Sequence, residues 1–165
     1  MRKRLLVPLS NKDAAPKSGW LDLEQAAVVE VSSEAGSHPI EGALLSDGAQ
    51  GWRANSPGLQ TIRLRFDHPQ TIRLIRVVFR EEESSRTQDF VLRWLPQGES
   101  AWKEIVRQQW NFNPPNTVEE SEQYNVELLS AVAIELSINP DISRAGAMAS
   151  LQRLQVSAEP QVKAV

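Results

Sequence analysis

Cysteine is absent from the chain, so a disulfide framework, a thiol nucleophile and a thiolate metal site are all excluded. Histidine is scarce as well: the sequence holds only His38 and His68, and each stands directly before a proline. Nucleophilic catalysis and transition-metal hydrolysis both depend on clustered imidazoles or an equivalent base. The zinc-protease, phosphate-loop and dinucleotide-binding motifs are also missing. We therefore expect a protein that is not an enzyme.

Long apolar runs are missing too. A basic N-terminus, Arg2 to Arg4, is followed by a short apolar stretch from Leu5 to Leu9 that Pro8 interrupts. A secretory signal needs an apolar core of about 7–15 residues, and a membrane helix needs about 20. We therefore expect a tail over residues 1–18, no membrane insertion and a cytoplasmic location, which the absence of cysteine also favours.

A strong positive charge is likewise lacking, since 18 Lys and Arg stand against 21 Asp and Glu, for a formal net charge of −3. Proteins that bind a phosphate backbone usually present a strongly basic surface. The net charge therefore argues against a nucleic-acid partner, although Arg63, Arg65, Arg73 and Arg76 fall on the faces of expected strands.

Apolar residues recur mostly with a period of two, which predicts strands rather than helices. The polar segment Asp67–Gln70 predicts a hairpin turn, and Pro39 followed by Ile40–Leu45 predicts one short helical turn. A chain of 165 residues fits one domain, which we place at residues 19–158, with a C-terminal tail at 159–165. We expect an all-β fold, a jelly-roll β-sandwich of about eight antiparallel strands. The expected strands are 26–32, 60–66, 71–80, 89–95, 101–110, 124–129, 132–138 and 148–158.

One segment stands out as a candidate binding loop, because we expect residues 111–123 to form a long irregular loop after an aromatic strand end. Long loops in small domains are often functional, and sugar sites combine an aromatic surface with planar hydrogen-bonding groups. Alternatively, the aromatic residues here pin the loop onto the sandwich. The candidate ligand-binding residues of this segment are Trp110, Asn111, Phe112, Asn113 and Asn116.

Arg80 and Arg86 are further candidates for ligand binding, because they flank the acidic segment Glu81–Glu83 in an expected turn. A guanidinium presents a planar fork of donors that suits ligand oxygens. The alternative is that the three glutamates simply neutralise the two arginines.

The order of several segments resembles the discoidin family, also called coagulation factor 5/8 type C domains. Its relatives are the galactose-binding-like domains and the family-32 carbohydrate-binding modules. The resemblance covers residues 26–158 and rests on the order of its segments. These segments are Ser32-Ser33, Ala43–Gly48, Trp52, Ile62–Phe66 and the two late strands "AIELSI" and "ASLQRLQVS".

The resemblance implies a sandwich whose loops at one end hold a ligand such as a sugar, a lipid headgroup or a protein. It also implies a structural Ca²⁺ held by backbone carbonyls, an Asp of the Asp-Gly loop and a Glu near the closing strand. Asp47 matches the Asp, whereas Gln152 stands where the Glu is expected, which removes one charge from the ligand set. An alternative interpretation is that Asp47 is a turn residue that ends the helical segment together with Gly48.

Three binding functions therefore follow. The first is a non-catalytic, discoidin-type module that binds carbohydrate. The second is a cytoplasmic domain for protein–protein interaction or assembly. The third is nucleic-acid binding, because the run "SS…H…LL…WRA" within residues 32–54 also resembles the N-terminal domain of a single-strand-break-repair scaffold protein with this fold. Shared fold alone does not transfer function.

Overall fold

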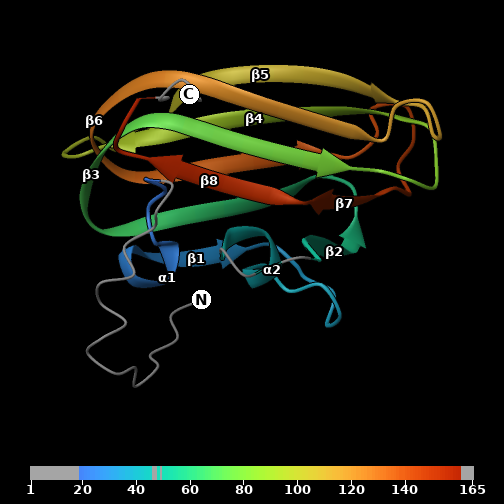
Figure 1. Ribbon diagram of the computed structural model, residues 1–165, viewed down its shortest axis with the longest axis horizontal. Coiled ribbons are helices and arrows are strands. Elements are labelled where there is room, and N and C mark those ends of the chain that lie inside the picture. The colour runs from blue at the N-terminus through green and yellow to red at the C-terminus, as the bar shows by residue number, and fades with distance from the viewer. Residues whose placement is uncertain (1–18, 46–47, 49, 161–165) are drawn as a thin grey trace.

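The computed structural model describes residues 19–45, 48 and 50–160. Within these residues the chain forms eight strands and two one-turn helices (Figure 1). This confirms the expected all-β class, and it adds α1 and β2, which the sequence did not predict. In chain order the elements are α1 (Leu23–Ala26), β1 (Ala27–Val31), α2 (Glu41–Leu44), β2 (Trp52–Pro57), β3 (Gln60–Arg80), β4 (Arg86–Pro96), β5 (Lys103–Phe112), β6 (Glu119–Asn139), β7 (Met148–Leu151) and β8 (Arg153–Ser157).

Two long strands, β3 and β6, each run for 21 residues and pair with each other through both layers of the sandwich. Their register shifts between Arg65 and Gln70, where the chain bends from one layer into the other (Figure 1). The hairpin turn predicted at Asp67–Gln70 is therefore wrong. Pro69 is tolerated inside the strand because an irregular register needs no ladder hydrogen bond from its nitrogen.

The first layer has the order β1-β3-β6-β4-β5 and uses the first half of β3 with the second half of β6. In the second layer, the second half of β3 lies between β8 and the first half of β6. All of these pairs are antiparallel, and β2 pairs with β7 in a separate two-stranded sheet. The arrangement is the antiparallel β-sandwich that the sequence predicts.

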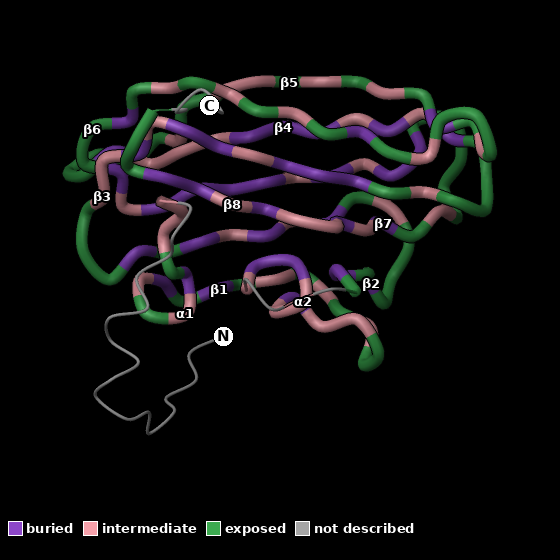
Figure 2. Tube along the Cα trace, viewed as in Figure 1, coloured by how far each residue is buried: buried purple, intermediate pink, exposed green. Residues whose placement is uncertain are grey.

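The core lies between the two layers, where buried residues concentrate along β3, β4, β6 and β8 (Figure 2). Phe79 of the second layer contacts Phe90 of the first, with ring centroids 5.0 Å apart. Both rings are fully buried, and burying a side chain of this size stabilises a fold by about 2–3 kcal/mol. Leu74 and Ile75 are both buried although they are neighbours, which explains why the apolar alternation slips there.

Two further sequence expectations need correction. The break expected at Ser130-Ala131 is absent, because β6 continues through Ser130 with a φ of 55° instead of ending there. The single strand expected at 148–158 is interrupted at Gln152 and forms β7 and β8.

Helix α2 forms as expected, and the N–H of Ile40, just before its first residue, donates to the Glu34 carboxylate over 2.9 Å. In the described part of the chain, no helix is long and apolar enough to cross a membrane.

Candidate functional site

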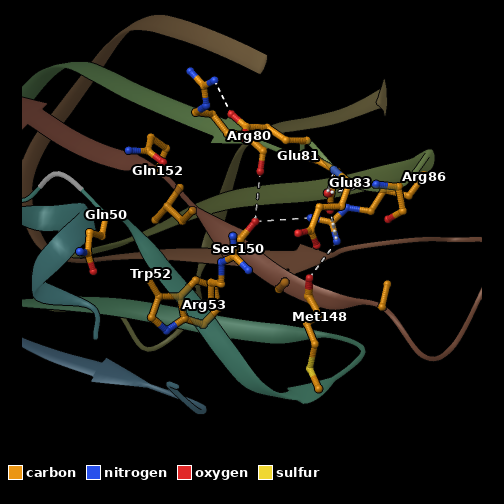
Figure 3. A pocket seen from close by; sticks show the side chains of 15 residues that line it. Gln50, Trp52, Arg53, Arg80, Glu81, Glu83, Arg86, Met148, Ser150 and Gln152 are labelled. Atoms are coloured by element: carbon orange, nitrogen blue, oxygen red, sulfur yellow. Dashed lines mark hydrogen bonds and ion pairs between the residues drawn. The ribbon is translucent and has the colours of Figure 1, made fainter. Parts of the chain in front are cut away.

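A pocket of about 400 Å³ opens at the end of the sandwich where β2, β7 and the β3–β4 turn meet (Figure 3). This volume lies in the ~300–1,000 Å³ range of small-ligand sites. Its wall is mainly polar. The hydrogen-bonding side chains that line it are Gln50, Arg53, Arg80, Glu81, Glu82, Glu83, Ser84, Arg86, Ser150 and Gln152.

Arg86 forms the fixed inner wall of the pocket. Its Nη1 lies 3.0 Å from the Glu81 carboxylate and donates to the main-chain carbonyl of Met148 over 2.9 Å. Its Nη2 donates to the Ser150 hydroxyl over 3.4 Å (Figure 3). Burial lowers the pKa of Arg86, and the charge of Glu81 opposes that shift. Protein groups occupy both terminal nitrogens, while the buried Nε has no hydrogen-bond partner among the described residues. Arg86 therefore mainly shapes the pocket wall.

Arg80 is paired as well. Its Nη2 lies 2.6 Å from the Glu82 carboxylate, and its Nη1 lies 3.2 Å from the Glu119 carboxylate. Two of the three glutamates in the turn thus neutralise the two arginines beside them, which is the alternative that the sequence left open. Arg80 is exposed, so its charge faces solvent at the pocket rim.

Arg53 differs from the other two arginines. It is exposed, stands directly opposite Ser150 in the β2–β7 pair, and has no ion-pair or side-chain hydrogen-bond partner among the described residues. The positive charge of Arg53 repels that of Arg86 and so contributes to the lowered pKa of Arg86. Glu83 lines the same pocket, is exposed, and its carboxylate also lacks a partner within the described residues. The pocket therefore offers both an unoccupied donor and an unoccupied acceptor.

Trp52 lines the pocket, but its ring is buried and is not free to stack on a ligand. Its side chain is buried, and its Nε1 donates to the main-chain carbonyl of Ser33 over 3.0 Å. The apolar part of the rim is Met148, whose side chain is 45% exposed. An apolar sugar face entering this pocket would meet a thioether rather than an aromatic ring.

The predicted aromatic group lies outside the pocket. Trp110 and Phe112 belong to β5, so the irregular loop expected over residues 111–123 is wrong: the connection to β6 is short and spans residues 113–118. Phe112 is buried, and the guanidinium of Arg86 lies 6.0 Å from its ring centroid. Trp110 packs against the core. These two rings pack the end of β5 onto the sandwich, which agrees with the alternative that the aromatic residues have a structural role.

The three predicted asparagines serve the neighbouring turns. Asn111 accepts from the Thr87 hydroxyl over 2.7 Å, and Asn113 accepts from the Ser85 hydroxyl over 3.1 Å. Asn116 is exposed within the β5–β6 turn, and its N–H donates to the Asn113 carbonyl over 2.9 Å. The structure thus brings Arg80 and Arg86 into the pocket, and it places the asparagines in the adjoining turns.

Besides Arg86 Nε, three more buried side chains have polar atoms without hydrogen-bond partners among the described residues: the amide of Gln88, the Nε1 of Trp110 and the carboxylate of Glu120. Burial, together with the nearby charge of Glu122, raises the pKa of Glu120 to about 7. Burial also raises the pKa of Tyr124. Near neutral pH, Glu120 is therefore partly protonated inside the sandwich.

Asp47, the expected calcium ligand, lies outside the described residues. Two carbonyls of the same loop already have a cationic partner, because Arg153 donates through Nη1 to the carbonyl of Leu45 and through Nη2 to that of Gly48. No group of three or more acidic or histidine side chains suited to a metal ion occurs in the described part of the chain. These residues do not fit a calcium ion, since a guanidinium and a divalent cation repel each other at shared carbonyls.

The fold matches known carbohydrate-binding modules. A family-32 module from C. perfringens NanJ, solved with galactose, matches with a TM-score of 0.62 and 13% identity over 84% of this chain and 97% of its own. The chain has the discoidin-like fold. The family-32 module of AlyQ, solved with 4,5-unsaturated mannuronic acid, matches this discoidin-like sandwich with a TM-score of 0.57 and 17% identity over 80% and 95% of the two chains.

A pectin-binding carbohydrate-binding module also matches the discoidin-like sandwich, with a TM-score of 0.56 and 19% identity over 80% of this chain and 90% of the module. At these identities the likeness concerns the fold. No protein-family model matches the sequence, and no curated protein matches it either.

Proposed function

We propose that this discoidin-like domain is a non-catalytic module that binds carbohydrate in the pocket between β2, β7 and the β3–β4 turn. The observation that carries the proposal is the pair of unoccupied polar groups on the pocket wall, the guanidinium of Arg53 and the carboxylate of Glu83. A sugar hydroxyl both donates and accepts a hydrogen bond, so a wall with a free donor and a free acceptor suits a polyhydroxylated ligand.

The rest of the pocket supports the same ligand class. Gln50 adds an amide, and exposed Met148 gives an apolar contact for the face of a sugar ring. The ion pairs of Arg80 and Arg86 hold the surrounding wall in one arrangement, which reduces the ordering cost of binding. The carbohydrate ligands of the AlyQ and NanJ modules favour a sugar over a protein or nucleic-acid ligand.

A screen against immobilised oligosaccharides, both neutral galactose-containing and uronic-acid-containing, tests the proposal. We expect binding to at least one class, competed by the free sugar. A correctly folded protein that binds no saccharide would overturn the carbohydrate proposal and favour the protein-interaction alternative. A cytoplasmic location stays a prediction.

A further inference from the structure

We infer that the Arg153 guanidinium takes the place of a structural metal ion at the carbonyls of Leu45 and Gly48, which lie between α2 and β2, so that these carbonyls need no calcium. The inference concerns folding of the pocket wall and stands without the proposed sugar ligand. Its basis is the position of the Arg153 guanidinium, which donates from two nitrogens to two carbonyls of one connection, those of Leu45 and Gly48.

Carbonyl oxygens removed from water need hydrogen-bond donors or a cation, because unpaired carbonyls destabilise a fold. The Leu45 carbonyl also accepts from the Gly48 N–H over 2.9 Å, so Arg153 is its second donor. A calcium ion would meet this need with charge and several oxygen ligands. A guanidinium meets it with charge and a planar fork of N–H groups. Arg153 begins β8, directly after Gln152 at the break between β7 and β8, so the paired strand β3 fixes its main chain.

The same connection is held tightly on its other side. Gly51 has a φ of +72°, and a Cβ there would lie 2.7 Å from the carbonyl oxygen of Leu151. A Cβ on Gly42 would likewise lie 2.7 Å from the carbonyl oxygen of Gly51. The main chain of the connection thus packs directly against α2 and the end of β7. Arg153 completes this packing from the β8 side.

The anchored connection leads into the pocket wall. Gln50 and Trp52 both line the pocket, as does Gln152, the residue beside Arg153 (Figure 3). Fixing Leu45 and Gly48 therefore fixes the entry of the chain into β2, which carries Arg53.

Thermal unfolding of the full chain in EDTA and in excess calcium chloride tests the inference. If the domain had a calcium site, a free calcium concentration of 100 times its Kd would raise the unfolding midpoint by roughly 5–10 °C in a domain of this size. We expect the two midpoints to coincide and isothermal titration with calcium chloride to give no binding heat. A calcium-dependent midpoint would overturn the inference.

Arg153→Gln is the matching variant, and Arg73→Gln is its control, because Arg73 also donates to a carbonyl but makes one contact, to Ala158. We expect Arg153→Gln to lower the midpoint by roughly 4–10 °C and Arg73→Gln by about 2 °C or less. Arg153→Lys keeps the positive charge but lacks the planar pair of N–H donors, so we expect its midpoint to lie between those of the unmodified chain and Arg153→Gln. Equal midpoints for the glutamine variants would contradict the role of Arg153.

Two further outcomes separate this inference from the proposed function. If Arg153→Gln does not fold, the comparison of EDTA with calcium on the unmodified chain still decides the question. If no sugar binds under any condition, the carbohydrate proposal fails while the midpoints remain informative. Sugar binding that requires calcium would overturn the inference and leave the carbohydrate proposal standing.

Discussion

The carboxylate of Glu81 lies 3.0 Å from the guanidinium of Arg86, and the two side chains are only 13% and 6% exposed. The pair joins the β3–β4 turn to the first residue of β4, and Arg86 extends it to β7 through the carbonyl of Met148. The β3–β4 turn and β7, which are more than sixty residues apart in the sequence, are thereby fixed around one pocket. The pair is structural, which leaves ligand contacts to the unpaired groups of the wall.

Arg86→Gln tests this structural role. Removing one partner of a buried ion pair leaves an uncompensated charge, so we expect a loss of about 3–5 kcal/mol in the free energy of unfolding, measured by urea denaturation. Arg107→Gln is the control, because Arg107 is 53% exposed and its nearest acidic partner is 49% exposed. Its loss is expected to stay within about 1 kcal/mol. Similar losses in both variants would show that the Arg86 pair is not structural.

Glu120→Gln tests the buried carboxyl of β6. The pKa of Glu120 is raised from 4.5 to about 7 in the folded chain, so folding favours its protonated form. The stability that the protonated Glu120 side chain contributes is complete below 4.5, its pKa in the unfolded chain. That stability is lost as the pH rises through about 7, its pKa in the folded chain. Between pH 4.5 and 7 the loss amounts to about 3 kcal/mol.

The measurement for Glu120 is the free energy of unfolding as a function of pH. Relative to the Glu120→Gln variant, the unmodified chain is expected to lose stability across that pH window. Glu127→Gln, an exposed change on the same strand, should follow the unmodified curve. Parallel curves for the unmodified chain and Glu120→Gln would refute the raised pKa.

Gly51→Ala tests the close packing beside the pocket. Alanine at a φ of +72° is strained, and its Cβ would lie 2.7 Å from the carbonyl of Leu151, so we expect a loss of roughly 3 kcal/mol in unfolding free energy. Gly58→Ala separates the two causes, because Gly58 has a φ of +85° but nothing within 4 Å of the added Cβ. Its loss should be about 1–2 kcal/mol, from backbone strain alone. Equal losses would mean that contact with Leu151 contributes nothing.

Much of the fold could be predicted from local patterns. Alternating Ile62, Leu64 and Phe66 predicted a strand with one buried face, and all three are buried. The segment Asp67–Gln70 misled the prediction, because polar residues with a proline suit a hairpin turn and also suit an irregularity inside a bent strand. Only pairing with β6, more than fifty residues later in the chain, distinguishes the two.

The site was predictable only in part. Arg80 and Arg86 are candidates from the sequence because they flank a charged turn at the ends of strands, and both line the pocket. Phe112 was assigned to a ligand, although it keeps the alternation of β5 and its ring faces the core. Arg53 was missed because its place in the pocket depends on the pairing of β2 with β7, for which the sequence carries no local signal.

The most direct test of the carbohydrate proposal is the affinity of the best saccharide from the screen for three proteins: the unmodified chain, Arg53→Gln and Arg107→Gln. Both variants lose one charge from an exposed arginine, but only Arg53 lines the pocket. Losing a charge-assisted hydrogen bond corresponds to roughly a 10- to 100-fold weaker Kd. Calorimetric titration is expected to show that weakening for Arg53→Gln and an unchanged Kd for Arg107→Gln. An unchanged Kd for Arg53→Gln, with both variants folded, would contradict the proposed site.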